Sequence, residues 1–236
     1  MSVYEVSYYF GRRRQYLGQF KLTDRKYNTI KRVFDLSLCF LLAPLILPVM
    51  AIISIIVVFD SPGSPLFVQE RIGYNGRRFK LYKFRSMRKN FDDVQHRNFM
   101  KLYVTGKVGA GSDQDERVAK YKPIQQKDVT RIGYLLRKTS LDEIPQIFNV
   151  IKGDMSLVGP RPNVPWEVEA YKPWHYDRLE ALPGITGLAQ VMGRSDISFD
   201  DIARYDIQYI KNKAIHFDAW IFWQTVGAVL KGYGAG

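Results

Sequence analysis

The chain has 236 residues, enough for one domain with appendages and a buried core. Its 35 Lys and Arg outnumber its 23 Asp and Glu, and the formal net charge of +12 predicts an anionic partner: nucleic acid, an anionic lipid surface or a phosphate-bearing substrate. A single cysteine excludes an intramolecular disulfide and a cysteine-cluster zinc site, and three scattered histidines argue against a histidine metal site, which leaves a hard cation held by oxygen ligands.

The first segment, residues 1–30, is aromatic and basic, as in YYFGRRRQYLGQF, and has little periodicity. Tyr and Arg side chains are common at the headgroup depth of a membrane, so we interpret the segment as an interfacial lead-in. A disordered tail of the same composition stays open as the alternative.

The longest apolar run extends from Leu36 to Phe59, and a helix of that length can cross a bilayer. A buried core helix is the alternative, but an unbroken apolar helix this long is rare in a soluble domain of this size. Eight Lys and Arg residues lie close to the run on either side, between Gly11 and Arg32 and between Asp60 and Lys89. The positive-inside rule therefore places both ends on the cytoplasmic face.

Two prolines, Pro44 and Pro48, lie inside this run, where each removes a helix hydrogen bond and clashes with the preceding turn. One straight crossing cannot keep both basic flanks on one face, whereas a helix that enters, bends and returns can. The sequence therefore predicts a re-entrant, monotopic membrane helix over residues 31–60, bent at the prolines. Hydroxyls of Ser37 or Ser54, water or neighbouring protein would bond the freed carbonyls.

The remainder, residues 61–236, is expected to form one domain on the cytoplasmic face, of α+β class and mostly helical. Asn75-Gly76 lies between two β-rich runs and predicts a small β-hairpin. The polar residues 91–126 contain GKVGAGSDQDE, which lacks the ending of a phosphate-binding P-loop and is interpreted as a flexible loop in a helix-and-loop insertion. Residues 200–212 are expected to be helical.

Near the end, FDAWIFWQTVGAVL is too short to span a bilayer. Trp220 and Trp223 favour an interfacial C-terminal helix, with burial in the core as the alternative.

The most regular stretch, residues 127–162, predicts two amphipathic helices separated by KTS, with Gly153 ending the second. Ser140 and Glu143 have the spacing of a capping box, which would account for the neighbouring carboxylates of Asp142 and Glu143 without any function. The same helix dipole keeps Asp142 ionised, which also suits a nucleophile or a magnesium ligand.

Arginines supply the opposite charge. Arg137 lies five residues before Asp142, and Arg161 stands between two prolines in GPRP. A rigid loop that presents a guanidinium fork fits phosphate binding, although a surface turn with a charged tip explains the motif equally well. Weaker candidates for substrate or phosphate binding are Lys83, Arg85, Arg194 and Asp206. Together, the basic groups, the paired acids and the membrane helix indicate chemistry on a diphosphate at a membrane surface.

These residues closely resemble the bacterial sugar transferase family, the monotopic phosphoglycosyl transferases. The similarity starts at KRVFD and includes QERIGYNGRRFKLYKFRSM, LRKTSLDEIPQIFNVIKGDMSLVGPRP and LPGITGLAQVMGR. The resemblance implies a catalytic dyad at Asp142 and Glu143. Asp142 would attack the β-phosphate of a UDP-sugar, release UMP, and pass the sugar-1-phosphate from a covalent aspartyl intermediate to a polyprenyl phosphate, typically undecaprenyl phosphate.

The resemblance also implies a cofactor and a location. Mg²⁺ would neutralise the diphosphate, with Asp142 as a ligand, while Arg137, Arg161 and Arg194 would offset charge on the phosphoryl oxygens. The site would lie at the cytoplasmic face of the bacterial inner membrane and serve the first membrane step of exopolysaccharide, O-antigen or glycan synthesis. Many members carry Ser-Pro at the bend, where this chain has Leu47-Pro48, so Pro48 is expected to make the main bend and Pro44 to be an addition of this chain.

A membrane-anchored basic module that binds anionic lipid or nucleic acid without catalysis is the alternative. It fits the charge and the apolar run, but gives no reason for Asp142 and Glu143 beside Arg137. We therefore expect no nucleic-acid partner. The oligomeric state stays open, with a homodimer as one candidate.

Overall fold

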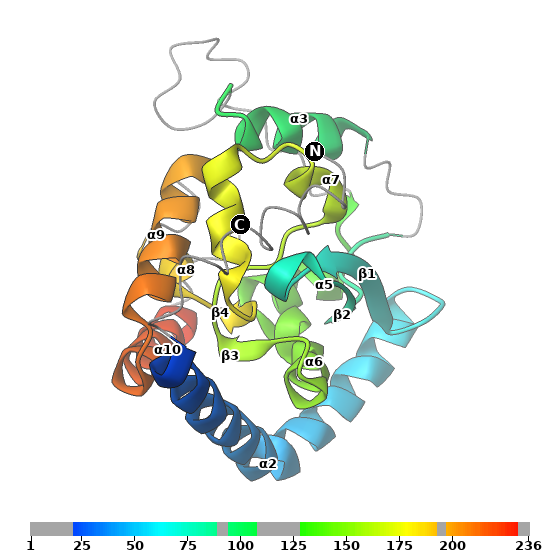
Figure 1. The fold of residues 1–236 in the computed structure, drawn as a ribbon. Coiled ribbons are helices and arrows are strands. Elements are labelled where there is room, and N and C mark those ends of the chain that lie inside the picture. The colour runs from blue at the N-terminus through cyan, green and yellow to red at the C-terminus, as the bar shows by residue number, and fades with distance from the viewer. Residues whose placement is uncertain (1–20, 89–93, 108–127, 193–196, 231–236) are drawn as a thin grey trace.

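The computed structural model describes residues 21–88, 94–107, 128–192 and 197–230. This part of the chain is mostly helical, with two small two-stranded sheets, which confirms the α+β class (Figure 1). The 3₁₀ helices are labelled η. In chain order the elements are α2 (Lys21–Asp60), β1 (Leu66–Ile72), η1 (Tyr74–Gly76), β2 (Arg78–Phe84), α3 (Val94–Val104), α5 (Arg131–Lys138), η3 (Leu141–Gln146), α6 (Ile147–Lys152), β3 (Ser156–Val158), α7 (Pro165–Val168), η4 (Pro173–Glu180), β4 (Gly184–Thr186), α8 (Leu188–Met192), α9 (Phe199–Asn212) and α10 (Ile215–Leu230).

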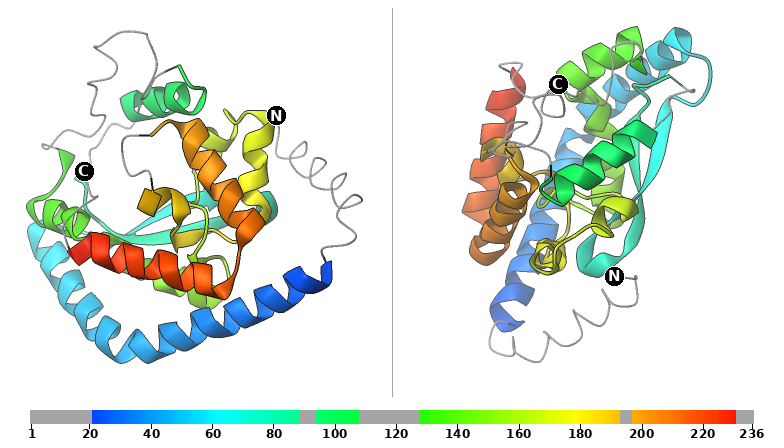
Figure 2. Two further views of the ribbon diagram at one scale, coloured as in Figure 1. Left: turned by 90° about the vertical axis from the view of Figure 1, so that its left-hand side faces the viewer. Right: turned by 90° about the horizontal axis from the view of Figure 1, so that it is seen from above.

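Helix α2 has 40 residues and begins ten residues before the predicted start at residue 31. Among the described residues it is the one helix long and apolar enough to cross a membrane. Pro44 and Pro48 lie inside it, and Figures 1 and 2 show a helix that is bent near its middle. Missing hydrogen bonds and ring clashes at the two prolines account for such a bend.

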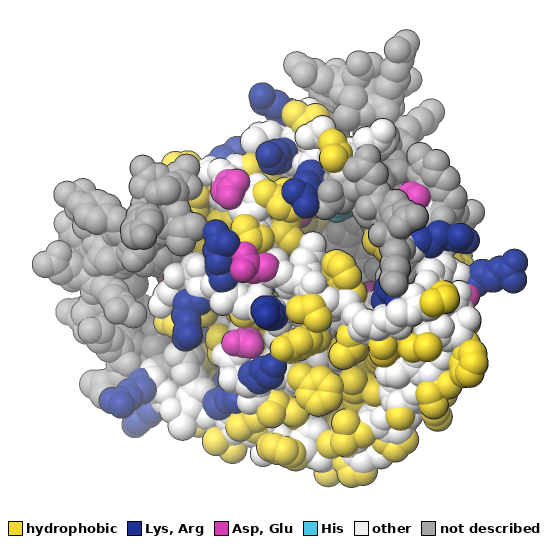
Figure 3. Space-filling model, turned by 90° about the vertical axis from the view of Figure 1, so that its right-hand side faces the viewer, with side chains coloured by type: hydrophobic (Ala, Val, Ile, Leu, Met, Phe, Trp, Pro, Cys, Tyr) yellow, Lys and Arg dark blue, Asp and Glu magenta, His cyan; other side chains and the backbone are white. Residues whose placement is uncertain are grey.

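Both arms of α2 contact the rest of the protein. Cys39 in the first arm belongs to a buried cluster with Leu81 of β2, and Met50, Ile53 and Val57 in the second arm pack with Phe84 and Leu136. The opposite face of α2 carries exposed large apolar side chains: Ile30, Val33, Phe34, Phe40, Leu41, Leu45, Leu47, Ile52, Ile55, Ile56, Val58 and Phe59. In Figure 3, hydrophobic side chains gather along the lower edge, below a region with many charged groups.

Polar contacts attach the first arm of α2 to the C-terminal helices. The Lys31 ammonium lies 3.0 Å from the Asp218 carboxylate of α10, which also accepts hydrogen bonds from Tyr27 and Tyr209. Ser156 of β3 donates to the Asp35 carboxylate at 2.7 Å. These contacts are largely buried, so they fix the position of the first arm.

The predicted hairpin is confirmed. Strands β1 and β2 pair antiparallel, from Leu66 opposite Phe84 to Ile72 opposite Arg78. Asn75 (φ 54°) and Gly76 (φ 76°) both lie in the left-handed region, which Asn and Gly tolerate best and which this hairpin turn requires.

The two helices predicted within residues 127–162 are also confirmed, as α5 and as η3 followed by α6. Gly153 ends α6 in the left-handed conformation (φ 87°). Pro145 lies inside η3, so the second helix begins with a 3₁₀ turn. The parallel pairing of β3 with β4 was not predicted from the sequence.

The end of the chain matches the expectation in part. α9 spans Phe199–Asn212 and α10 spans Ile215–Leu230. In α10, Ile221 is completely buried, whereas the Trp223 side chain is 70% exposed. The helix therefore packs one side on the core, as the burial alternative expected, and presents another side outward, while an interfacial role for that outer side stays a prediction.

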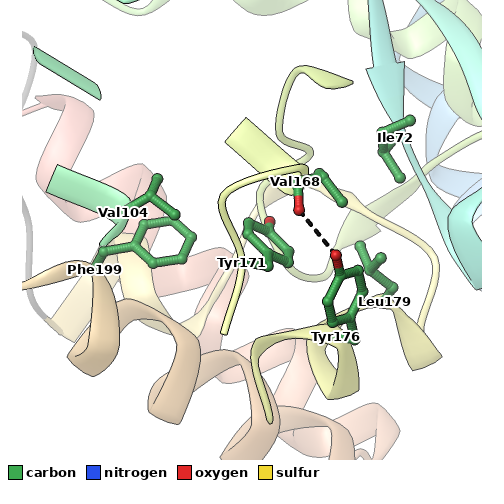
Figure 4. Close-up of a cluster of buried hydrophobic side chains, with 7 residues drawn as sticks. All are labelled: Ile72, Val104, Val168, Tyr171, Tyr176, Leu179 and Phe199. Atoms are coloured by element: carbon green, nitrogen blue, oxygen red, sulfur yellow. Dashed lines mark hydrogen bonds between the residues drawn. The ribbon is translucent and has the colours of Figure 1, made fainter. Parts of the chain in front are cut away.

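A third cluster of buried side chains joins elements distant in sequence (Figure 4). It contains Ile72, Val104, Val168, Tyr171, Tyr176, Leu179 and Phe199, from β1, α3, α7, α9, η4 and the loop before η4. The Tyr176 hydroxyl donates to the Val168 carbonyl at 3.1 Å, so this buried hydroxyl has a hydrogen-bond partner. Ile72 of this cluster also pairs with Asn163, the residue that follows the GPRP motif, through a 2.8 Å hydrogen bond from its amide to the Asn163 carbonyl.

Candidate active site

The start of η3 differs from the predicted capping box. Ser140 adopts the left-handed conformation (φ 56°), and its side chain makes no cap hydrogen bond. A capping residue needs extended dihedrals to aim its hydroxyl at the first turn, so this conformation prevents the cap. The capping-box interpretation was wrong, and the carboxylates of Asp142 and Glu143 are therefore not accounted for by helix capping.

Glu143 instead joins two distant segments. Its Oε1 accepts a 2.6 Å hydrogen bond from Nζ of Lys83 on β2 and a 3.3 Å hydrogen bond from Nη1 of Arg161 in the GPRP loop. The side chains of Lys83 and Glu143 are 17% and 18% exposed, whereas that of Arg161 is 50% exposed. The Glu143 carboxylate thus binds one largely buried cationic side chain, Lys83, and one solvent-accessible cationic side chain, Arg161.

The charges around Glu143 keep it ionised. Burial would raise the pKa of Glu143, but the Lys83 and Arg161 charges and hydrogen bonds outweigh burial and lower the pKa to about 2. Burial lowers the pKa of the Lys83 ammonium, an effect that the Glu143 carboxylate opposes. A carboxylate with so low a pKa is a weak base at neutral pH.

Asp142 has the opposite environment. With the described residues its carboxylate forms no hydrogen bond or ion pair. Burial raises the pKa of Asp142, and repulsion from Glu143 adds to this, against the attraction of Lys83, Arg137 and Arg161. Adjacent carboxylates with divergent pKa values are typical of groups with different roles in one reaction.

The GPRP loop is held by backbone hydrogen bonds to the β4 region. The Gly159 amide donates to the Thr186 carbonyl at 2.8 Å, and the Gly184 amide donates to the Pro160 carbonyl at 2.9 Å. A Cβ on Gly159 would lie 2.3 Å from the Leu182 carbonyl oxygen, so only glycine fits. The unpredicted β3–β4 pairing therefore places this loop.

Two arginine side chains donate hydrogen bonds to backbone carbonyls of the GPRP loop. Arg178 Nη2 donates to the Arg161 carbonyl at 3.2 Å, and Arg71 Nη1 donates to the Pro162 carbonyl at 3.0 Å. Burial, with repulsion from Arg161, lowers the pKa of Arg71 to about 10. Neither residue was singled out from the sequence. Arg71 lies in the quoted stretch QERIGYNGRRFKLYKFRSM, whereas nothing around Arg178 distinguishes it from a surface arginine.

The other predicted residues are distributed around this centre. Arg137, in the last turn of α5, acts electrostatically on Asp142. Arg85 is buried and donates to the carbonyls of Ser61 and Pro62, which places it at the end of α2. Asp206 is 1% exposed and pairs with Arg178, so it does not face the dyad directly. Arg194 lies outside the described residues.

A divalent metal can be considered from the donors present. No group of three or more His, Cys, Asp and Glu side chains gathers in the described part of the chain. Mg²⁺ usually takes one or two protein carboxylates together with substrate phosphates and water. Asp142 fits this pattern because no residue in the described part of the chain pairs with its carboxylate, whereas Glu143 already binds Lys83 and Arg161.

Comparison with known proteins gives a consistent result. A family model described as bacterial sugar transferase matches residues 26–232. Similar proteins include the UDP-galactose-lipid carrier transferase of Erwinia amylovora, which is 41% identical over 206 residues covering 87% of this chain and 41% of that protein. The undecaprenyl-phosphate galactose phosphotransferase of Salmonella typhimurium is 37% identical over 217 residues, 92% of this chain and 44% of that protein.

One similar protein is close to this chain in matched length. The exopolysaccharide production protein ExoY of Rhizobium meliloti is 37% identical over 199 residues, 84% of each chain. By contrast, the chain spans less than half the length of the Erwinia and Salmonella proteins. The matched region contains the apolar helix, the dyad and the GPRP loop.

Proposed function

The chain belongs to the bacterial sugar transferase family, and from this we propose that it transfers a sugar-1-phosphate from a UDP-sugar to a polyprenyl phosphate, typically undecaprenyl phosphate, and releases UMP. The observation that carries the proposal is that the two carboxylates of the dyad have different surroundings. Glu143 binds Lys83 and Arg161, while the adjacent Asp142 carboxylate lies among positive charges and forms no hydrogen bond or ion pair with the described residues. The product would be the lipid-linked sugar that begins an exopolysaccharide, O-antigen or other glycan.

In the first step, an Asp142 carboxylate oxygen attacks the β-phosphorus of the UDP-sugar. The bond between that phosphorus and the oxygen bridging to the α-phosphate breaks, and UMP leaves with the bridging oxygen. The sugar-phosphate remains on Asp142 as an acyl phosphate. The exposed Arg161 guanidinium and the Lys83 ammonium, both positioned by Glu143, stabilise the charge on the phosphoryl oxygens, and Arg137 adds to this field.

In the second step, a phosphate oxygen of the polyprenyl phosphate attacks the same phosphorus and displaces the Asp142 carboxylate. A diphosphate-linked sugar forms and Asp142 is regenerated. The low pKa of Glu143 supports a role in holding Lys83 and Arg161 rather than in removing a proton. Because the intermediate is covalent, one site can serve a water-soluble donor and a lipid acceptor in turn.

Asp142 would also hold Mg²⁺ together with the diphosphate of the donor. The cation would neutralise phosphate charge and so assist departure of UMP. This assignment is supported by the Asp142 carboxylate, which forms no hydrogen bond or ion pair with the described residues, whereas Glu143 already binds Lys83 and Arg161.

We further propose that α2 enters and leaves the membrane on the cytoplasmic face of the bacterial inner membrane. Three observations support this: the prolines within α2, the contacts of both arms with the same body, and the apolar outer face. Leu141 and Ile144 flank the dyad and pack on the Met50–Val57 part of α2, which would bring Asp142 to the membrane surface. Residues 1–30 would form an interfacial lead-in, residues 31–60 the membrane helix, and residues 61–236 the catalytic domain with an interfacial α10.

The proposal is tested with purified protein, Mg²⁺ and undecaprenyl phosphate. A panel of UDP-glucose, UDP-galactose and their N-acetylated forms is supplied, and UMP release and lipid-linked product are measured. We expect at least one donor to give both products. If no donor releases UMP, the site instead serves the binding of anionic lipid without catalysis.

A further inference from the structure

Arg178 makes the densest set of hydrogen bonds of any side chain around the GPRP loop. The residue is 2% exposed, and its Nε and Nη2 donate to Oδ2 of Asp206 on α9 at 2.9 and 2.5 Å. Its Nη1 donates to the Tyr171 hydroxyl at 2.8 Å and to the Asn163 side-chain oxygen. Four residues from three segments therefore hold the guanidinium of Arg178, counting the Arg161 carbonyl that accepts from Nη2 at 3.2 Å.

Arg161 is the residue through which this network reaches the dyad. Its carbonyl oxygen is bound by Arg178, and its side chain donates to Glu143. The backbone of Arg161 is thus fixed from the interior while its guanidinium is presented at the surface of the site. One residue connects the buried Arg178–Asp206 pair to the carboxylate beside the nucleophile.

A buried ion pair is an expensive way to stabilise a fold, because both ions lose their hydration and apolar residues of the same volume often serve as well. Both members of this pair are almost completely buried, with side chains 2% and 1% exposed. Arginine, unlike lysine, offers several donors in one rigid plane, so it can bind a carboxylate and orient backbone carbonyls at the same time. The Arg178–Asp206 pair is therefore better explained by a need to hold the Arg161 backbone in place than by a need to stabilise the fold.

We propose that Arg178, held by Asp206, is a positioning residue that sets the backbone of Arg161 so that its guanidinium meets the donor diphosphate. Asp206, which the sequence suggested as a substrate-binding group, acts on the substrate only through Arg178 and Arg161. This inference rests on the proposed function, since it assigns a role within the same phosphate-binding site.

A double-mutant cycle tests the proposal. Asp206→Asn is made in the wild-type protein and in an Arg161→Lys background, and kcat and KM for UMP release are measured with UDP dissociation constants from calorimetry. We expect Asp206→Asn to lower kcat/KM about tenfold in the wild type and less than about twofold after Arg161→Lys, because charge-assisted hydrogen bonds have effects of this size and the two residues act in series. The affinity for UDP should fall in the wild-type background and change little after Arg161→Lys. The cycle can therefore be evaluated from UDP binding even if the variants release no UMP.

Arg178→Lys separates positioning from charge balance. It keeps a cation opposite Asp206 but cannot reproduce the fork that reaches the Arg161 carbonyl. We expect its activity to fall as far as that of Asp206→Asn while its unfolding temperature stays closer to that of the wild type. Wild-type activity in Arg178→Lys would overturn the proposal, because charge balance alone would then suffice.

The matched control is Asp200→Asn, the same substitution on the same helix. Asp200 pairs with Lys172 and His175, and neither partner belongs to the GPRP loop, so the effect of Asp200→Asn should be the same factor in both backgrounds. If Asp206→Asn also lowered kcat/KM by the same factor in both backgrounds, the proposal would be overturned.

If Asp206→Asn does not fold, Tyr171→Phe replaces it in the cycle. We expect Tyr171→Phe to lower kcat/KM about threefold, because it removes one hydrogen-bond acceptor of Arg178 and no buried charge. Wild-type protein that neither binds UDP nor releases UMP would instead contradict the proposed function.

Discussion

The Glu143 carboxylate lies 2.6 Å from the Lys83 ammonium, whereas the neighbouring Asp142 carboxylate has no such partner among the described residues. The two side chains are adjacent in the chain, yet the pKa of Glu143 is lowered and that of Asp142 is raised. The structure therefore distinguishes a carboxylate that organises cations from one that is available to react or to bind a cation.

The first prediction concerns Lys83. Its charge lowers the pKa of both Asp142 and Glu143, so Lys83→Met should raise both. Since the nucleophile must be ionised, the acid limb of the pH–rate profile for UMP release should move to higher pH. We expect kcat/KM at neutral pH to fall about 100-fold, as for the loss of one oxyanion-type donor. Lys80→Met, at an exposed position of the same strand, is the control and should leave the profile unchanged.

The second prediction concerns the dependence of stability on pH. The folded pKa of Glu143, about 2, is below the ordinary value of 4.5, so its ionisation stabilises the fold above the unfolded pKa, and this contribution is lost as pH falls through the folded pKa. Thermal unfolding in detergent should show the largest difference between wild type and Glu143→Gln above about pH 5, shrinking toward about pH 2. A difference that is constant over this range would contradict the assigned ion pairs.

The third prediction concerns the GPRP loop. A Cβ at Gly159 would lie 2.3 Å from one backbone oxygen and 2.9 Å from the Gly184 nitrogen, so Gly159→Ala must displace the loop and with it Arg161. We expect UMP release to fall about 100-fold or more, because a displacement near 1 Å in a catalytic group has this effect. Gly227→Ala is the matched control: it meets nothing within 4 Å in α10 and should leave activity intact. Equal activity of the two variants would show that the loop adapts.

The fourth prediction concerns the prolines of α2. Single cysteines at positions 2 and 61, in a Cys39→Ala background, should both react with a membrane-impermeant reagent added from the cytoplasmic side. The double variant Pro44→Ala, Pro48→Ala restores two helix hydrogen bonds and favours a straight helix, so it should move one label to the opposite face. Labels on opposite faces in the otherwise native chain would mean that α2 crosses the membrane.

Much of the fold could be predicted from local sequence. Asn75-Gly76 specifies its hairpin through backbone dihedrals, and helical spacing of apolar residues specifies α5, α6 and α9. The β3–β4 pairing could not be predicted because each strand has three residues, too few for any periodicity, and their pairing depends on contacts 28 residues apart in the chain.

The residue types of the candidate site could be predicted from the sequence, but the hydrogen bonds and ion pairs between them could not. Spacing suggested that Glu143 caps a helix, whereas a left-handed Ser140 frees it to bind Lys83, 60 residues away. Arg178 carries no sequence signal, because its role depends on burial and on acceptors from three other segments: residues 161–163, Tyr171 and Asp206. Such long-range contacts follow from tertiary packing and are invisible to local pattern.

The most direct test of the account is the intact mass of the protein after incubation with a donor UDP-sugar and Mg²⁺ in the absence of polyprenyl phosphate. We predict that the wild-type protein releases UMP once per molecule and gains the mass of one sugar-phosphate, located on the peptide that contains Asp142. Asp142→Asn should gain nothing. An adduct of equal yield in Asp142→Asn, or acceptor-dependent UMP release by a wild-type protein that never carries the adduct, would contradict Asp142 as the nucleophile.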